Sequence, residues 1–491
     1  MPKYVLCAST QRNISQRLLT GCYVGQVIFI NVLPDDLLLA IFDFCVDGNA
    51  FTKKEMETWQ SLVHVCRRWR SIVFESPRRL KLQLVCTTKT PARDTLDVWP
   101  SLPLLIRDSA YLSTGLNNIV ALLAHSDRVC QINLMGVPGS HLEKIPAAMQ
   151  EPFPELIHLL LWSHGTAAVL PDSFLGGSAP RLQLFWLDGI PFPSLPKLLS
   201  SATHLVTLHL VDIPHSGYFS PEAMAASLST LTRLESFRLG FRSPRSLPDQ
   251  ASRRPPPPTR TILPALTNFS FRGVSEYLDD LVAYIDTPRI NSLVITFFNQ
   301  IVFDTPQFTQ FISRIPTLKA LEKARVDFEW GLYGGASYNL SSKTSGYGEL
   351  TVRIQCSELD WQISSLEQVC TSSLPPLSML EDLYIFEDRF WQEDKGHIEN
   401  ALWLELLRPF SVVKNLYLSE EFAPRIVPAL GGLVGDRMTE GLPLLENIFL
   451  EGLQSSGPIQ KDIAQFVVAQ GIASHPIAVT RWNRVRDEDG H

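Results

Sequence analysis

Three histidines close together in the sequence, His204, His209 and His215, are the first candidates for chemistry, because imidazole nitrogens bind zinc and related ions. The residues around them alternate between apolar and polar types, which predicts a β-strand with His209 on its exposed face. His204 precedes this strand and His215 follows a proline turn. We therefore predict surface histidines here and no metal site.

Two pairs of neighbouring carboxylates, Asp35/Asp36 and Asp279/Asp280, could supply a general acid and a general base. Each pair begins a predicted helix, where the helix dipole already favours acidic side chains. The sequence contains no G-x-x-x-x-G-K-[ST], G-x-S-x-G or H-E-x-x-H motif and no Cys/His set at zinc spacing. No residue is marked as a nucleophile with its base, so we expect a non-catalytic protein that needs no cofactor.

The charge balance argues against a nucleic-acid partner. The 491 residues include 43 Lys and Arg against 50 Asp and Glu, a net charge of −7 without a general basic excess. One stretch is dense in basic residues: Arg67, Arg68, Arg70, Arg78, Arg79 and Lys81. We interpret it as the solvated side of an amphipathic helix and the turn after it, with a phosphate-binding patch as the alternative.

The eight cysteines are scattered without a C-x-x-C pair, which favours a reducing compartment, cytoplasmic or nuclear. The apolar run within residues 1–30 has about seven residues, whereas a bilayer span needs roughly twenty. The same stretch lacks the basic start and unbroken apolar core of a signal peptide. We treat residues 1–30 as an amino-terminal extension and expect a soluble protein with no membrane partner.

The elements that position these side chains follow from a repeat, L-x-x-L-x-L with other apolar residues allowed, between residues 129 and 450. Its copies begin at Val129, Leu156, Leu182, Leu205, Leu234, Leu266, Ile290, Leu321, Tyr347, Leu380, Val413 and Leu445. The alternation within each copy predicts a strand, and amphipathic helical patterns such as SPEAMAASLSTLTRL lie between the strands. In that helix Ser220 is the expected N-cap and Pro221 the first helical residue.

The predicted fold is α/β, with one strand and one helix per repeat, stacked so that neighbours bury a continuous core. This pattern resembles the leucine-rich repeat over residues 81–486. The spacing often exceeds the ~20 to 29 residues of that family, and apolar residues such as Val137 and Ile190 stand where its Asn or Cys is expected. We therefore predict an irregular solenoid, with loop insertions at 243–261 and 331–350. The second insertion is predicted as either a long hairpin or a mobile loop.

The polar side of the predicted strands offers a surface for a protein partner. It mixes aromatic and polar side chains, as recognition surfaces do. We predict that an unidentified client protein binds there through Trp186, His209, Arg238, Tyr384 and Tyr417.

Two amphipathic stretches near the start, LPDDLLLAIFDFC and WQSLVHVCRRWRSIVF, each predict a short helix. Together they carry more apolar surface than a segment of this size buries in a core of its own. Two explanations remain open at this point. The helices are a cap covered by the following repeats, or they are a docking site for another protein.

The order of residues in these stretches resembles the F-box over residues 31–80: an LP…LL…IF opening, then V-C, two arginines and W. With the repeats that follow, the chain resembles fungal, basidiomycete-type F-box proteins with carboxy-terminal leucine-rich-like repeats. The resemblance implies a non-catalytic substrate receptor of an SCF-type ubiquitin ligase, docked on a Skp-type adaptor and through it on a cullin scaffold. A repeat scaffold or a non-ligase F-box adaptor protein is the alternative.

By this resemblance, the adaptor contacts fall on Leu33, Pro34, Leu37, Ile41, Phe42, Leu62, Val65, Cys66 and Trp69. Some of these residues must hold the helices to each other instead. For Trp69 an internal wedge and a surface anchor are both open.

Overall fold

The computed structural model describes residues 30–482, with its longest internal gaps at 46–57, 245–258, 388–398, 432–440, 453–462 and 469–476. It divides into two compact units. The first, here the helical unit, takes in the chain up to Val85 together with Trp99–Pro103. The second, the repeat unit, takes in Cys86–Val98 and the chain from Leu104 onward. Of the predicted extension 1–30, all but Ile30 lies outside the described residues.

The described part of the helical unit contains α2 (Asp35–Cys45), α4 (Thr58–Val63) and α5 (Arg67–Glu75). The prediction of one helix over 59–74 is wrong, because the chain is interrupted between α4 and α5. Cys66 is extended, with φ −159° and ψ 171°, and its Sγ accepts a hydrogen bond from the backbone N–H of Trp69. A thiol in this N-cap position begins a new helix instead of continuing the old one.

Trp59 of α4 is the centre of the helical unit's core and was not anticipated from the sequence. Its side chain is 0% exposed. Its ring centroid lies 5.2 Å from that of Trp99 and 6.3 Å from that of Phe74. The indole N–H donates to the carbonyl of Gln83 at 3.2 Å, so burial leaves the polar edge of the ring satisfied.

The repeat unit is built on one long sheet in which every predicted repeat strand is present. In spatial order its strands include β2 (Leu104–Asp108), β3 (Val129–Pro138), β4 (His158–His164), β5 (Leu184–Asp188), β6 (Thr207–Ile213), β7 (Ser236–Phe241), β9 (Asn268–Gly273), β11 (Ser292–Phe298), β14 (Glu349–Gln355), β13 (Gly335–Ser341), β12 (Lys323–Glu329), β15 (Asp382–Glu387), β16 (Asn415–Leu418), β17 (Asn447–Glu451) and β18 (Ala478–Trp482). Neighbours pair in parallel except where β13 is involved.

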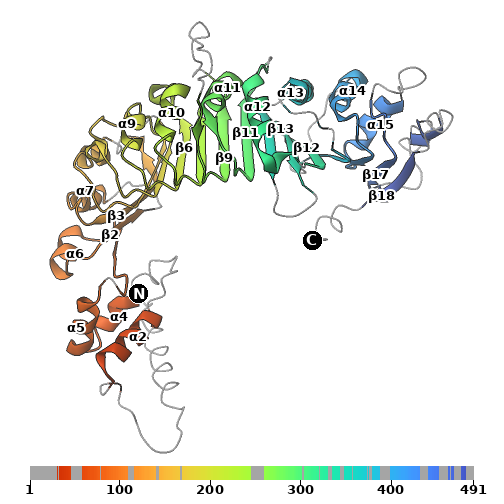
Figure 1. Ribbon diagram of the computed structural model, residues 1–491. Coiled ribbons are helices and arrows are strands. Elements are labelled where there is room, and N and C mark those ends of the chain that lie inside the picture. The colour runs from red at the N-terminus through yellow and green to blue at the C-terminus, as the bar shows by residue number, and fades with distance from the viewer. Residues whose placement is uncertain are drawn as a thin grey trace, which may run out of the picture. The chain divides into compact units, whose positions relative to one another are not determined.

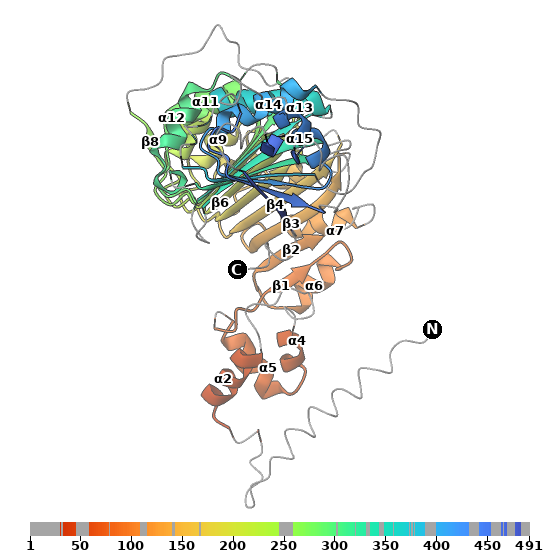
Figure 2. The same ribbon diagram turned by 90° about the vertical axis from the view of Figure 1, so that its right-hand side faces the viewer.

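The helices of the repeat unit lie along one face of this sheet (Figures 1 and 2). They include α6 (Ala92–Val98), α7 (Leu116–Leu123), α8 (Lys144–Ala148), α9 (Leu195–Leu199), α10 (Pro221–Leu228), α11 (Ser275–Tyr284), α12 (Pro306–Arg314), α13 (Leu359–Ser372), α14 (Asn400–Leu407) and α15 (Ala423–Gly431). The apolar side chains of the strands pack against them; Phe269 of β9, for example, contacts Phe311 of α12. We call the opposite face of the sheet the open face.

The start of α10 follows the sequence signal. Ser220 caps α10, its Oγ accepting from the N–H of Ala223 at 3.2 Å, and Pro221 is the first helical residue, as predicted. The expectation of one helix per strand is met only in part, since the connection between β4 and β5 contains the short 3₁₀ helix Phe174–Gly177 instead.

The regular series is broken by an antiparallel insertion in the middle of the sheet. β11 pairs in parallel with β14, β14 pairs antiparallel with β13, β13 pairs antiparallel with β12, and β12 pairs in parallel with β15. For the predicted insertion 331–350 the mobile loop is therefore wrong, because Gly335–Ser341 is a strand inside the sheet and Glu349 begins another. The hairpin alternative agrees with the antiparallel pairing of β13 with both neighbours. This segment mixes small residues with Tyr338 and Leu340, which are buried in the core.

The other predicted insertion, 243–261, lies mostly outside the described residues. Its last residue belongs to β8 (Thr261–Ile262), which pairs in parallel with β10 (Ile285–Asp286) as a separate small sheet. A further short strand, β1 (Leu84–Cys86), precedes α6 in the chain. Within the described ranges, no helix combines the length and the apolar character needed to cross a membrane.

Candidate functional site

The five residues predicted for client binding lie in one row that crosses the open face. In the strand register, each of these residues pairs with a residue of the same row on the neighbouring strand. In spatial order the row runs Asn133, Leu160, Trp186, His209, Arg238, Ser270, Val294, Thr351, Asn339, Arg325, Tyr384, Tyr417 and Phe449. The predicted residues therefore form two groups, on β5–β7 and on β15–β16.

The first group joins an aromatic ring, an imidazole and a cation. The rings of Trp186 and His209 meet edge to face with centroids 5.0 Å apart. His209 Nε2 lies 3.0 Å from the hydroxyl of Ser236. Burial lowers the pKa of His209, and the positive charge of Arg238 lowers it further. His209 thus favours its neutral form, which can donate or accept a hydrogen bond at this surface.

Replacement of Arg238 by Gln is expected to raise the pKa of His209 while leaving it below the ordinary value for a histidine side chain. The charge repulsion is removed, whereas the burial remains. The pKa of His209 is lower in the folded chain than in the unfolded chain, so the unfolded chain is protonated first as the pH falls. Acidification therefore decreases the contribution of His209 to the free energy of unfolding. Nuclear magnetic resonance titration of the imidazole measures the change. His158, whose pKa is lowered by burial and by Arg107, is the internal control and should not respond.

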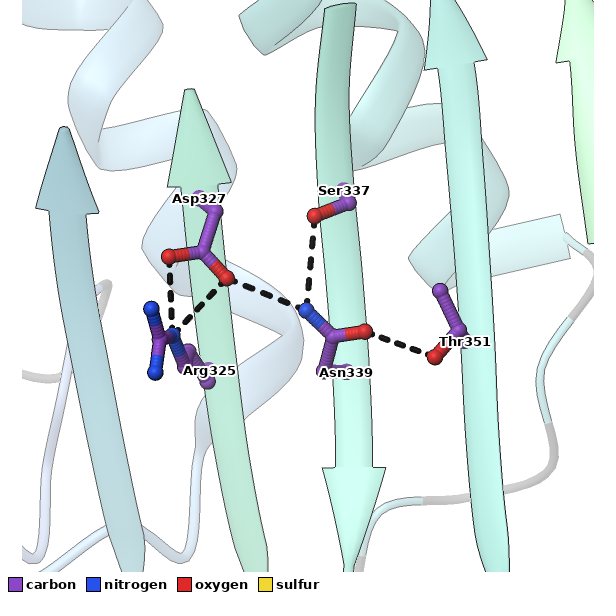
Figure 3. Close-up of polar contacts among 5 residues, drawn as sticks. All are labelled: Arg325, Asp327, Ser337, Asn339 and Thr351. Carbon is purple, nitrogen blue, oxygen red and sulfur yellow. Dashed lines mark hydrogen bonds and ion pairs between the residues drawn. The ribbon is translucent and has the colours of Figure 1, made fainter. Parts of the chain in front are cut away.

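The centre of the open face holds a chain of polar contacts on β12, β13 and β14 (Figure 3). Arg325 Nε donates to both carboxylate oxygens of Asp327, at 2.8 and 2.9 Å. The amide nitrogen of Asn339 donates to Asp327 at 3.0 Å and to Ser337 at 3.3 Å. The hydroxyl of Thr351 donates to the amide oxygen of Asn339 at 2.7 Å. These contacts fix the direction of each side chain across three strands.

A hollow of about 490 Å³ opens above this network. Its charged lining residues are Arg238, Arg325, Arg353, Asp327 and Glu329, and the hydroxyl-bearing residues Thr296, Ser337 and Thr351 also line it. Arg325 is paired with Asp327, and Arg353 with Glu329. The hollow therefore carries more positive than negative charge.

The second predicted group belongs to a stack of aromatic rings at the carboxy-terminal end of the row. Tyr384 and Tyr417 are stacked with centroids 4.1 Å apart, and Tyr417 and Phe449 with centroids 4.4 Å apart. Trp482 of β18 lies against Phe386 at 5.5 Å. A second hollow of about 570 Å³ is lined by Tyr384, Phe386 and Trp482, and it shares Arg325, Asp327 and Asn339 with the first hollow.

Of the residues that line these two hollows, only Arg238 and Tyr384 were predicted from the sequence. Ser337 and Asn339 fell in the predicted loop, and Trp482 follows the last recognised repeat. Arg325 stands at a polar position of a predicted strand, so the alternation could have found it. Among the described residues, no group of three His, Cys, Asp or Glu side chains is arranged to hold a metal ion.

The helical unit offers a second surface, because α2 is apolar on two faces. Leu38, Leu39 and Phe42 are buried, whereas Leu37 is 53% exposed, Ile41 40% and Phe44 90%. Positions 37, 41 and 44 recur at helical spacing and therefore form one exposed stripe. Phe44 was not among the predicted contact residues.

The other residues predicted for adaptor contact fall into two classes. Pro34 and Val65 are exposed, and Leu33 and Leu62 are half-buried. Phe42, by contrast, is 0% exposed and packs on the half-buried ring of Trp69 at 4.7 Å. Phe42 and Trp69 therefore hold α2 and α5 together, and Cys66 caps α5. In this conformation none of these three presents a broad apolar surface.

Two arginines of the basic run, Arg68 and Arg70, contribute to the same packing. Arg68 Nε donates to Asp35 Oδ1 at 2.9 Å, and Arg68 Nη2 donates to the carbonyl of Leu33 at 2.5 Å. Arg70 Nε donates to the carbonyl of Val63 at 3.0 Å. These arginines therefore join α5 to the start of α2 and to the end of α4.

Comparison with known proteins adds little to this geometry. No family model matches the chain, and no curated protein matches it. Among solved structures it is similar to the leucine-rich repeat-containing protein LegL7 from Legionella pneumophila, with 12% identity and a TM-score of 0.24, over 78% of this chain and 97% of that chain. The strand register and the L-x-x-L-x-L spacing decide the fold. The repeat unit is a leucine-rich-repeat-like solenoid.

Proposed function

We propose that this chain is a non-catalytic F-box protein that acts as a substrate receptor of an SCF-type ubiquitin ligase. In this role the exposed stripe of α2 docks on a Skp-type adaptor, and through it on a cullin scaffold. The open face of the repeat unit holds the client. Such a protein works in the cytosol or the nucleus.

The observation that carries the proposal is the second apolar face of α2. A helix needs one apolar stripe to pack against its own domain. Here that stripe is Leu38, Leu39 and Phe42, so Leu37, Ile41 and Phe44 are in addition to it. Covering the exposed half of Leu37 or Ile41 contributes roughly 1 kcal/mol each, and covering Phe44 contributes about 2 kcal/mol. A partner helix bundle gains this energy on docking.

The mechanism is proximity. The receptor joins an adaptor-binding surface and a client-binding surface in one chain, which raises the effective concentration of the client near the ligase's transfer centre. The chemical step belongs to the ligase's enzyme, and the receptor contributes orientation and residence time.

Leu37→Asp combined with Ile41→Asp is expected to weaken adaptor binding by at least about a hundredfold. Each substitution removes an apolar contact and places an unpaired charge in the interface. Binding is measured by co-purification with a Skp-type adaptor and by titration calorimetry. Both positions are exposed, so the fold should tolerate the change, and circular dichroism verifies this.

The matched control is Val169→Asp combined with Met379→Asp. These side chains are also exposed and apolar, at 49% and 60%, but belong to the repeat unit. They should leave adaptor binding unchanged. A folded wild-type chain that recovers no Skp-type adaptor, or a Leu37/Ile41 variant that binds it normally, would contradict the proposed docking role.

A further inference from the structure

We propose that the open face binds an extended client segment that places a carboxylate side chain, Asp or Glu, over Arg238 and an apolar or aromatic side chain against Tyr384 and Trp482. This inference rests on the proposed function in one respect: the bound partner is taken to be a client protein. The recognition itself follows from the charges and rings of the open face.

The charge balance of the first hollow identifies the carboxylate. Three arginines and two carboxylates line it. Arg325 and Arg353 have carboxylate partners in Asp327 and Glu329, whereas the exposed Arg238 has no hydrogen bond or ion pair within the described residues. Among the described lining residues, one positive charge is therefore left without a counterion. A guanidinium binds a carboxylate through two parallel hydrogen bonds. Thr296 and Thr351 add to the polar lining of the hollow.

The same balance favours a carboxylate over a phosphate group. A phosphorylated side chain brings a charge of about −1.5 to −2 at neutral pH. A hollow with one uncompensated cation would leave part of this charge unpaired beside Asp327 and Glu329. A single Asp or Glu side chain matches the available charge.

The second hollow binds the other end of the segment. Its wall of Tyr384, Phe386 and Trp482 is aromatic, and its charged lining residues, Lys323, Arg325, Asp327 and Glu349, balance one another. It therefore favours an uncharged apolar or aromatic side chain. The two hollows share Arg325, Asp327 and Asn339 and are adjacent, so one ligand can enter both.

The distance between Arg238 and Tyr384 sets the length of the segment. Arg238 on β7 and Tyr384 on β15 are separated by six neighbouring strand pairs. At about 4.8 Å per pair, the separation is at most roughly 29 Å. An extended peptide covers this with at most about nine residues.

The test uses a phage-displayed library of random nine-residue peptides, selected on the full chain. The expected result is enrichment of Asp or Glu toward one end and of aromatic or large apolar residues toward the other. Arg238→Gln should lose the acidic enrichment and keep the apolar one, whereas Arg238→Lys should retain both. Arg233→Gln, which removes an exposed arginine in the turn before β7, is the matched control and should select like the wild type.

Peptides from this selection are then used to measure how much the acidic residue contributes to binding affinity. By fluorescence anisotropy, replacing the acidic residue by Gln or Asn should weaken binding to the wild type about tenfold, and should change binding to Arg238→Gln by less than about twofold. Selection without acidic enrichment, or acidic enrichment that survives in Arg238→Gln, overturns the inference. So does a phosphoserine replacement that binds about tenfold more tightly than the carboxylate.

The outcomes also separate this inference from the proposed ligase role. A chain that selects acidic peptides but binds no Skp-type adaptor supports the inference and contradicts the proposed function. A chain that binds the adaptor through α2 but selects no acidic peptide contradicts the inference alone.

Discussion

Trp59→Ala is expected to unfold the helical unit while the repeat unit stays folded. Removal of a fully buried tryptophan costs about 3–5 kcal/mol, and Trp59 has contacts with Trp99 and Phe74 and a hydrogen bond to Gln83. A single small core rarely supplies more than about 3–5 kcal/mol of stability. The substitution therefore removes most of what holds α2, α4 and α5 together.

Hydrogen exchange read by mass spectrometry checks this result. Amides of α2, α4 and α5 should lose protection, and amides of the repeat strands should keep theirs. Leu37→Ala is the control, because this side chain is 53% exposed and its loss should leave protection unchanged. Native protection of α5 in Trp59→Ala would refute the assignment of Trp59 as the central core residue.

Trp403→Ala is expected to destabilise the carboxy-terminal part of the repeat unit by about 3–5 kcal/mol. Trp403 of α14 is 1% exposed. Its ring lies 6.0 Å from Phe328 of β12 and 5.4 Å from Phe422, which precedes α15. The side chain of Trp403 therefore links three successive repeats of the solenoid. The stability of a solenoid is approximately the sum of the stabilities of its repeats and of the interfaces between neighbouring repeats. The loss of stability should therefore be confined to the repeats near Trp403.

Urea unfolding combined with hydrogen exchange measures the extent of this loss. Strands β12, β15 and β16 should open at lower urea than β4–β7. Trp361→Ala removes a tryptophan from α13 that is 43% exposed, and it should cost less than about 1 kcal/mol. Equal destabilisation by the two substitutions would show that Trp403 does not have the bridging role described here.

The positions of the repeat strands could be predicted from the sequence, but their order could not. Period-two alternation is a property of each segment and marks its buried residues, such as Phe185 and Leu187 in β5. Which strands pair is decided by tertiary contacts. Leu321 and Tyr347 begin copies of the same pattern, and nothing in the pattern shows that the second strand lies beside β11 and the first beside β15.

The candidate sites show the same division. Alternation placed Trp186, His209, Arg238, Tyr384 and Tyr417 on one face, and the structure places them in one row. The polar network at the centre depends on β13, whose small and polar residues predicted either a long hairpin or a mobile loop and did not place it inside the sheet. On α2 the pattern identified apolar positions, but only packing separates the buried Phe42 from the exposed Ile41.

The antiparallel insertion has a consequence for synthesis on the ribosome. Between β5 and β6, each residue finds its partner 23 positions later, as Leu184 does in Thr207. Ser292 of β11 instead pairs with Glu349, 57 positions later. At ribosomal rates of about 5–20 residues per second, the edge of β11 that later pairs with β14 has no neighbouring strand for roughly 3–11 s. During this interval the nascent chain exposes an unpaired strand edge, the kind of surface that chaperones bind and that aggregation starts from.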